Sequence, residues 1–459
     1  MSQQPDDRTD GDPEHLSSID TAWYRMDTET NQAYIGGILL FDEPVDFDEL
    51  RRLIDERLIG LFPRFRQKVV ESTGRMARPT WQEDEKFELD AHLHHLALPE
   101  PGDKGVLQET ASELMTQALD YERPLWQFYL LDNYQGGSAF LVKLHHCLGD
   151  GFALARVLLS MADEGYGLEA PVAQGEGGER AEAHKSLGAR VRGELEDRLL
   201  EPDGRRALIR EIGDVAAELG HIVLMPFDPQ TRLKNRLKGH VRVAWSESLS
   251  LEEIKEIGHQ LDATVNDVLM AGVTGALRTY LAEADEPVDT ISVRAIVPVN
   301  LRPAGSIEEM EAVLGNEFGL VFLELPIFSE KIDERLREVK QNIDALKESP
   351  EAVVAFGILT AEGAASAPVE YLVNDIFARK ASLVVSNVPG PKQPLRIAGQ
   401  ELADLMFWVP HPTDFGLGIS LISYNGRVNI GVRADTAICE DPQALVDGIV
   451  EEFESLREA

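Results

Sequence analysis

His145-His146-Cys147-Leu148-Gly149-Asp150-Gly151 is the stretch of this sequence that decides the fold. An apolar run at 139–144 precedes it and predicts a buried strand. The run 152–161 follows it, and its apolar residues recur at helical spacing. The stretch therefore predicts a strand, a tight turn and a helix, in which Gly149 and Gly151 supply unusual backbone angles. A histidine at the end of a rigid strand has a fixed orientation, which is what a general base needs.

The composition restricts the partners of the chain. Its 459 residues suffice for two or three domains, and its formal net charge is −36. So acidic a chain is a poor partner for nucleic acid and for anionic lipid. Its two cysteines form no disulfide framework and fit a reducing cytosol. The polar start resembles no signal peptide and no apolar run is long enough to span a bilayer, so we expect a cytoplasmic protein, soluble or peripheral on a membrane.

Three further motifs carry information beyond this stretch. Pro124-Leu125-Trp126 opens a predicted strand, in which Trp126 taken alone would be a core residue. Val265-Asn266-Asp267-Val268 begins a predicted helix, and Asn266 and Asp267 could simply cap it. Ser386-Asn387-Val388-Pro389-Gly390-Pro391 ends a predicted strand in a rigid turn.

Together these motifs resemble the bacterial wax ester synthase/diacylglycerol acyltransferase family, one branch of the HHxxxDG acyltransferases. The resemblance covers nearly the whole chain and implies an α/β fold with mixed sheets, in which two chloramphenicol acetyltransferase-like domains enclose a tunnel. We accordingly expect a disordered tail over 1–14 and an N-terminal half with the HHxxxDG motif over 15–170. A linker with crossover helices should occupy 171–239, and a C-terminal half 240–459.

The resemblance implies an O-acyltransferase that moves a long-chain acyl group from acyl-CoA to a long-chain alcohol, a diacylglycerol, or both. Acyl-CoA would be a co-substrate, and no cofactor or metal is expected. The resemblance is also compatible with a monomer or homodimer that touches the inner membrane or lipid droplets peripherally. Two alternatives stay open, namely a condensation-type acyltransferase that uses a carrier protein and a non-catalytic lipid-droplet protein of the same fold.

The resemblance also assigns roles to individual residues. His146 would take the proton of the acceptor hydroxyl, with no acyl-enzyme, while His145 shapes the site. Asp150 would pair with an arginine, either Arg294 or Arg302, and hold the loop. Cys147 is a poor candidate for a nucleophile, because neighbouring side chains of a strand point to opposite faces. The expected substrate-binding residues are Gly151, Asn266, Asp267, Trp126, Asn387 and Pro389.

Two other clusters admit functional interpretations. His92, His94 and His95 could suggest a metal site, but too few further ligands lie nearby, which favours structural roles. The window 229–246 contains five basic residues and no acidic one. It could simply balance acidic neighbours, or it could attract the phosphates of coenzyme A or of lipids, which is our hypothesis. The basic residues are Arg232, Lys234, Arg236, Lys238 and Arg242.

Overall fold

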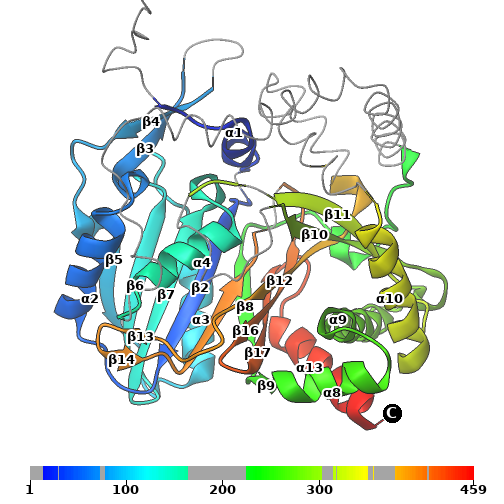
Figure 1. Cartoon of the computed structure of the whole chain (residues 1–459). Helices are drawn as coiled ribbons and strands as arrows, with labels where there is room; N and C mark the ends of the chain where they lie inside the picture. Colours follow the sequence, from blue (N-terminus) through cyan, green and yellow to red (C-terminus); the bar gives the residue numbers. More distant parts are fainter. Residues whose placement is uncertain are drawn as a thin grey trace, which may run out of the picture.

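Two mixed β-sheets lie side by side in the computed structural model of the chain (Figure 1). The structure describes residues 14–28, 30–72, 78–163, 224–301, 314–316, 318–349, 355, 378–410 and 413–458. The expected tail, apart from Glu14, and the expected linker up to residue 223 therefore lie outside the described residues.

The first sheet has five strands in the order β15-β2-β7-β6-β5. Its central strand β7 (Gly137–His145) is buried at every residue. It pairs with β2 on one side and β6 on the other, and it leads into the motif turn. The helix α4 (Gly151–Ser160) follows directly, so the predicted strand, turn and helix are confirmed. The other strands are β2 (Tyr34–Phe41), β5 (Leu93–Ala97), β6 (Trp126–Tyr134) and β15 (Asp404–Trp408). Helices α1 (Ser18–Arg25) and α2 (Phe47–Leu53), and a small sheet of β1 (Glu14–His15), β4 (Thr80–Glu83) and β3 (Gln67–Val70), complete this half.

The second sheet has the order β11-β10-β12-β16-β17-β8, with the short β9 (Leu249–Ser250) beside β17. Four helices gather beside it (Figure 1). The long helix α9 (Val265–Ala282) packs closely on α13 (Pro442–Glu458), since a Cβ at Gly272 would lie only 3.0 Å from the ring of Phe453. The strands are β8 (Val241–Trp245), β10 (Val293–Asn300), β11 (Phe318–Leu325), β12 (Leu383–Pro389), β16 (Leu417–Tyr424) and β17 (Arg427–Asp435), and the other two helices are α8 (Leu251–Gln260) and α10 (Ile332–Lys347).

The two halves exchange elements, which the expected boundaries did not anticipate. Strand β15 follows the start of the second half by more than 150 residues, yet it pairs antiparallel with β2 in the first sheet. In return, α3 (Lys104–Thr116) of the first half covers the edge strand β8 of the second. Ser112 Oγ accepts a hydrogen bond from the backbone N–H of Val243 at 3.0 Å, and Thr116 Oγ1 accepts one from Val241 at 3.0 Å. Hydroxyls of a helix thus take the place of a neighbouring strand and satisfy this edge.

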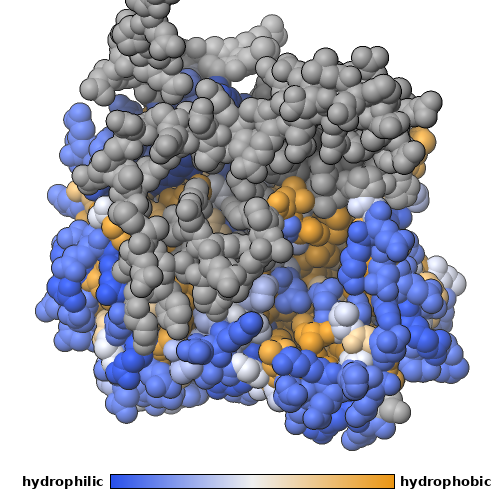
Figure 2. All heavy atoms as spheres, in the orientation of Figure 1, coloured by the Kyte–Doolittle hydropathy of each residue, from blue (hydrophilic) through white to orange (hydrophobic). Residues whose placement is uncertain are grey.

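Hydrophilic side chains cover most of the described surface in Figure 2, as the acidic composition requires, with hydrophobic patches between them. None of the helices in the described ranges combines the length and apolar character of a bilayer-spanning segment.

Candidate functional site

The motif turn joins β7 to α4 and is packed against the second half of the chain. His146–Leu148 form one turn of 3-10 helix, and Asp150 Oδ1 accepts a hydrogen bond from the backbone N–H of Ala153 at 2.9 Å, as a helix N-cap does. Gly149 has φ 167°, an extended conformation open to any residue, so the expectation of unusual backbone angles is wrong. Glycine is required at this position for lack of space instead, because a Cβ at residue 149 would lie 3.3 Å from the backbone nitrogen of Gly315.

His146 forms a cluster with aromatic rings supplied by both halves. Its imidazole stacks on Trp23 of α1, with ring centroids 3.9 Å apart and planes inclined by 13°. Phe318 of β11 approaches it from the second half at 5.5 Å, and only 5% of the residue is exposed. This burial lowers the pKa of His146 to about 4, against the opposing charge of Asp150. The ring is therefore neutral near pH 7 and able to accept a proton.

His145 is fixed by hydrogen bonds at both ring nitrogens. Its Nδ1 accepts from the backbone N–H of Cys147 at 3.1 Å, and its Nε2 lies 3.0 Å from the carboxylate of Asp27. The same carboxylate accepts from the hydroxyl of Tyr121 and from the backbone N–H of Ala33. Burial lowers the pKa of His145, but the contacts with Cys147 and Asp27 outweigh it and raise the pKa. His145 is thus fixed within the motif turn, and Asp27 is a partner that the sequence did not reveal.

Cys147 has the surroundings of an inert thiol. It is completely buried, and this burial raises the pKa of its thiol. Its backbone N–H donates to Nδ1 of His145, and the interaction of the thiol with the same histidine lowers the pKa of the thiol less than burial raises it. The thiol therefore lacks the lowered pKa and the access that a nucleophile needs.

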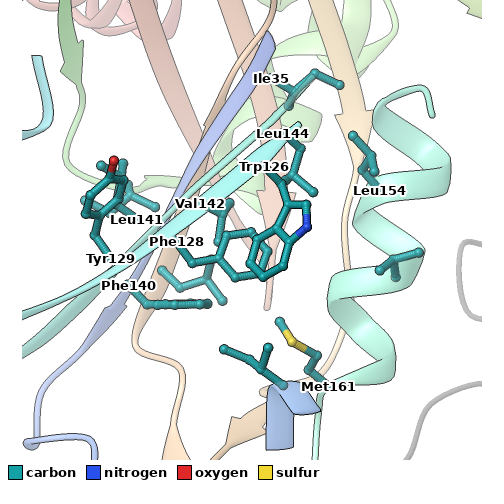
Figure 3. Packing of buried hydrophobic residues seen from close by; sticks show 14 of the residues in the cluster. Ile35, Trp126, Phe128, Tyr129, Phe140, Leu141, Val142, Leu144, Leu154 and Met161 are labelled. Atoms are coloured by element: carbon teal, nitrogen blue, oxygen red, sulfur yellow. The ribbon is translucent and has the colours of Figure 1, made fainter. Parts of the chain in front are cut away.

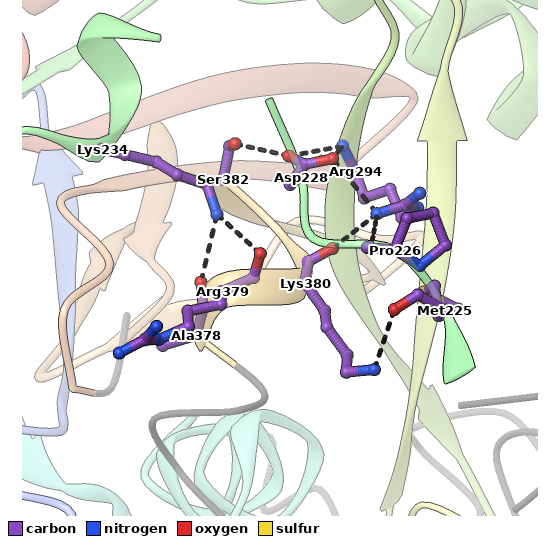
Figure 4. A network of polar contacts seen from close by, with 9 residues as sticks. All are labelled: Met225, Pro226, Asp228, Lys234, Arg294, Ala378, Arg379, Lys380 and Ser382. Atoms are coloured by element: carbon purple, nitrogen blue, oxygen red, sulfur yellow. Dashed lines mark hydrogen bonds and ion pairs between the residues drawn. The ribbon is translucent and has the colours of Figure 1, made fainter. Parts of the chain in front are cut away.

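The arginine expected to pair with Asp150 is not Arg294. Figure 4 shows Arg294 in another network, where its Nη1 lies 3.4 Å from Asp228 Oδ1 and its backbone N–H donates to the same carboxylate. Ser382 Oγ also donates to Asp228 at 2.5 Å, and burial raises the pKa of Asp228 to about 6. The network attaches residues 225–228 to the second sheet. Arg302, the other candidate, lies outside the described residues.

An apolar cavity lies where the two halves meet. The first half contributes side chains from β2, β7 and α4, and the second half contributes side chains from β12, β15 and β16. The wall includes Ile35, Leu154, Ala155, Val388, Met406 and Ile422, and Gly151 of the motif reaches it as well. A cavity of this composition can hold a hydrocarbon chain but no charged group.

Two of the expected substrate-binding residues are hydrogen-bonded to each other. Asn387 Nδ2 on β12 donates to Asn266 Oδ1 at the start of α9, at 3.1 Å. Asp267 is instead fully buried and forms a capping box with Thr264, so it is a helix cap rather than a substrate ligand. Pro389 is exposed and does not line the cavity, although Val388 beside it does.

Trp126 requires a further correction. Figure 3 shows its indole packed among Phe128, Val142 and Leu144 in the core of the first half. The ring is completely buried, and its Nε1 donates to the backbone carbonyl of Phe65 at 2.9 Å. Both faces and the polar atom of the side chain are therefore used by the protein, so Trp126 is a core residue and not a substrate ligand.

The three clustered histidines have separate neighbours. His92 Nδ1 lies 2.8 Å from the carbonyl of Trp126, while His95 Nε2 lies 2.7 Å from Asp132 Oδ2. His94 stacks on Tyr129. Each ring thus has a structural contact of its own, and the described residues include no group of three ligands suited to a metal ion.

The basic window is partly committed to the protein itself. The guanidinium of Arg232 lies 4.3 Å above the ring of Tyr280, and Lys234 Nζ donates to the carbonyl of Arg379 at 2.9 Å. Burial lowers the pKa of Lys234. Arg236, Lys238 and Arg242 are exposed. Only these three have the accessibility that phosphate binding would require, and the hypothesis stays a prediction.

Sequence reasoning missed the residues that surround the histidine. Trp23 and Asp27 had no assigned role, and Asn316 and Phe318 belonged to the segment 315–319, whose resemblance to the family implied only that it lines the interface between the halves. Asn316 Nδ2 donates to the carbonyl of His146 at 2.9 Å. The resemblance of this segment to a family element was the available signal.

Comparisons with known proteins agree with this geometry. The profile of the wax ester synthase/diacylglycerol acyltransferase catalytic domain matches residues 16–269, and that of the WS/DGAT C-terminal domain matches 314–457. A probable diacylglycerol O-acyltransferase of Mycobacterium tuberculosis is 26% identical over 95% of this chain and 94% of its own. A putative diacylglycerol O-acyltransferase of the same species is 28% identical over 90% of this chain and 88% of its own.

Solved structures share the fold. The wax ester synthase/diacylglycerol acyltransferase of Marinobacter aquaeolei superposes with a TM-score of 0.69 at 24% identity, covering 96% of this chain and 98% of that one. The first condensation domain of the calcium-dependent antibiotic synthetase gives 0.63 at 16% identity, covering 98% and 96%. The expected α/β fold with mixed sheets is therefore confirmed.

Proposed function

The chain belongs to the wax ester synthase/diacylglycerol acyltransferase family, and on this premise we propose that it transfers a long-chain acyl group from acyl-CoA to the hydroxyl of a long-chain alcohol or a diacylglycerol. The observation that carries the proposal is the buried imidazole of His146 at the junction of the halves, where it contacts Trp23 and Phe318. An apolar cavity that reaches Gly151 of the same motif supports a hydrocarbon chain as part of the substrate.

In the proposed reaction His146 acts as a general base. It takes the proton of the acceptor hydroxyl as the oxygen attacks the thioester carbonyl, which forms a tetrahedral intermediate. The intermediate then expels the thiolate of coenzyme A, which receives the proton from His146, and the ester is left. Both substrates are bound together, and no bond to the protein forms. The ring is suited to this role because burial favours its uncharged form and because it is stacked on Trp23, with Phe318 beside it.

The experiment is a transfer assay with radiolabelled palmitoyl-CoA and two acceptors, hexadecanol and dioleoylglycerol, offered separately. We expect labelled ester with at least one acceptor, and the ratio of the two products reports the preference. The variant His146→Ala should lose about 10²–10⁴-fold in kcat. His145→Ala is not a matched control, because its ring holds the turn. His94→Ala is the matched control, because the ring of His94 stacks on Tyr129 of another strand and lies away from the motif turn.

Three outcomes would contradict the proposal. Absence of labelled ester with both acceptors would exclude these two classes of acceptor. Equal activity of His146→Ala and the wild type would exclude the base. Transfer that occurs only from an acylated carrier protein, and not from acyl-CoA, would favour the condensation-type alternative.

A further inference from the structure

A short hairpin from the late part of the sequence packs on the first half of the molecule (Figure 1). It consists of β13 (Arg396–Ile397) and β14 (Gln400–Glu401), which pair antiparallel. Ala398 and Gly399 form the turn, with φ 50° and 78°, and positive φ at both residues is typical of a two-residue hairpin turn. The hairpin is therefore an element of defined geometry rather than an irregular loop.

Apolar side chains of this hairpin form part of the wall of the apolar cavity. Ile397 and Leu402, which directly follows β14, are buried and line the cavity. Leu395, which directly precedes β13, lines it as well. Arg396 and Glu401 of the same hairpin are exposed. The hairpin thus has one side toward the cavity and one toward solvent, as alternation along paired strands provides.

Hydrogen bonds hold the hairpin at both ends. At its base, the hydroxyl of the buried Tyr424 accepts from the backbone N–H of Leu395 and donates to the carbonyl of Leu402, at 2.9 Å each. At its tip, Asp163 Oδ2 accepts from the backbone N–H of Gly399 at 2.8 Å. The backbone N–H of Asp163 also donates to the first carbonyl of β13 at 2.7 Å. Because Asp163 follows α4, the tip is attached to the helix that begins in the motif turn.

The hairpin lies at the end of the cavity that is farther from the motif turn. Ile35 and Leu144 are paired at the near end, one residue before His145. Leu39 and Leu405 are paired at the far end, and both line the cavity. Since β14 ends shortly before Leu405, the hairpin stands beside this far pair. Its attachment to the last residues after α4 places it at the same end.

The distance between the two ends suits a long hydrocarbon chain. Ile35 and Leu39 are four residues apart on β2, which is roughly 13 Å. Gly151 and Leu159, which line the cavity from α4, are eight residues apart, which is roughly 12 Å. One leaflet of a bilayer has a hydrocarbon thickness of about 15 Å. The cavity therefore has the length to take most of such a chain, and the end of the chain would meet the hairpin.

We propose that the hairpin β13–β14 sets the maximum length of the substrate hydrocarbon chain: Ile397 and Leu402 stop the end of the chain, and Asp163 holds the hairpin in place. A wall that is fixed in this way rejects longer chains, because each methylene group too many lowers kcat/KM about 10-fold or more. The inference rests on the proposed acyl transfer, but the fit of a chain to the cavity can be measured without turnover. Both the acyl group and the acceptor alcohol carry such a chain, so the experiment varies them separately.

The test measures kcat/KM for saturated acyl-CoA of graded length with hexadecanol, and for alcohols of graded length with palmitoyl-CoA. Ile397→Ala enlarges the far end of the cavity, so the longest accepted chain should lengthen by about two carbon atoms in one of the two series. The kcat/KM of that longer chain should rise about 10-fold relative to that of the wild-type optimum. Ile397→Phe should shorten the longest accepted chain in the same series. The series that responds identifies the substrate whose chain occupies the cavity.

Binding is measured separately from transfer, by the rise in melting temperature that each compound causes. The compounds are thioether analogues of acyl-CoA, which cannot transfer their acyl chain, and the same alcohols. The chain length that gives the largest rise should be longer for Ile397→Ala than for the wild type. Ile54→Ala is the matched control, because Ile54 is a buried isoleucine of the same core that does not line the cavity. It should lower the melting temperature of the free protein and leave the length profile unchanged.

Asp163→Ala tests the attachment of the hairpin without disturbing the core, because Asp163 is exposed. Without the acceptor for the N–H of Gly399 the tip is less firmly held. Chains longer than the wild-type limit should therefore gain about 10-fold in kcat/KM, while the optimum length stays the same. Asp163→Asn keeps an oxygen that can accept from the same N–H, so it should restore the wild-type limit.

Three results would overturn the inference. A length profile that Ile397→Ala leaves unchanged in both series would mean that the hairpin does not stop the chain. An equal loss at all lengths in this variant would show only a weakened fold. A wild-type limit in Asp163→Ala, or a limit that Asp163→Asn does not restore, would contradict the role of the attachment. An enzyme without acyl transfer would refute the proposed function, and the binding profiles would then decide the inference by the same criteria.

Discussion

Removal of the indole that stacks on His146 should change the pH dependence of the enzyme more than its activity at neutral pH. Trp23 covers one face of the imidazole at 3.9 Å, and Phe318 lies at 5.5 Å from the other half of the chain. The pKa lowered from 6.5 to about 4 corresponds to roughly 3 kcal/mol of preference for the neutral ring. Trp23→Leu admits water to one face, so we expect the pKa of His146 to rise by about one unit.

The assay is kcat/KM for acyl-CoA across the acid range, because this ratio reports the ionisation of the free enzyme. The wild type should lose activity only as the pH falls toward about 4, since a protonated ring cannot accept the substrate proton. In Trp23→Leu the acid limb should lie near pH 5, and the activity at pH 8 should stay within about threefold of the wild type. Trp245→Leu is the control, because this buried indole packs on Trp408 and has no contact with His146.

The lowered pKa of His146 also makes the stability of the fold depend on pH. The pKa of His146 is lower in the folded than in the unfolded chain, so the unfolded chain binds more protons between pH 6.5 and about 4. Its contribution to stability is therefore complete above pH 6.5 and is lost as the pH falls through this window. Trp23→Leu should show a smaller loss. A wild-type acid limb near 6.5, or one that coincides with that of the variant, would refute the reasoning.

Three further predictions follow from single contacts. Asp150→Ala removes the N-cap of α4 and should cost about 1 kcal/mol in urea unfolding, whereas Asp150→Asn, which keeps an acceptor, should cost less; equal losses would contradict the capping role. Cys147→Ala should keep most of its activity, and the buried wild-type thiol, whose pKa burial raises, should resist alkylation at pH 7; inactivation that tracks alkylation would argue otherwise. Ala155→Phe places a ring in the apolar cavity and should shift the preference in kcat/KM toward shorter acyl-CoA chains; a uniform loss at all chain lengths would mean that the acyl group lies elsewhere.

Local features of the sequence predicted local structure well. The apolar run before His145 became β7, and Asp267 takes part in capping α9, as one reading of its motif allowed, because periodicity and capping act within a few residues. The Asn425-Gly426 pair, which is typical of a hairpin turn, connects β16 and β17, with φ 46° and 76°. These signals need no knowledge of the rest of the chain.

Partners that are distant in the sequence could not be predicted in the same way. Strand β15 has an unremarkable apolar pattern, and nothing in it specifies pairing with β2 rather than with a strand of its own half. Trp126 is a different kind of error, in which a motif suggested a substrate-binding role for a residue of the core. The motif alone does not say whether the side chain faces a substrate or the core. Its indole N–H is satisfied by Phe65, a residue that no motif connects with it. Gly149 was expected for its backbone angles and is required for the approach of Gly315.

The enclosure of His146 has opposite effects on its basicity and on its selectivity. Burial lowers the pKa of the base, and a weaker base accepts a proton less readily. The rings of Trp23 and Phe318 exclude water, which would otherwise compete with the acceptor alcohol for the thioester. In the proposed reaction the base is therefore weaker, but the site favours transfer of the acyl group to the alcohol over hydrolysis of the thioester. Trp23→Leu should raise the release of free fatty acid relative to ester, measured in one assay by separating the two labelled products. A stronger base with an unchanged product ratio would mean that water is excluded by other parts of the site.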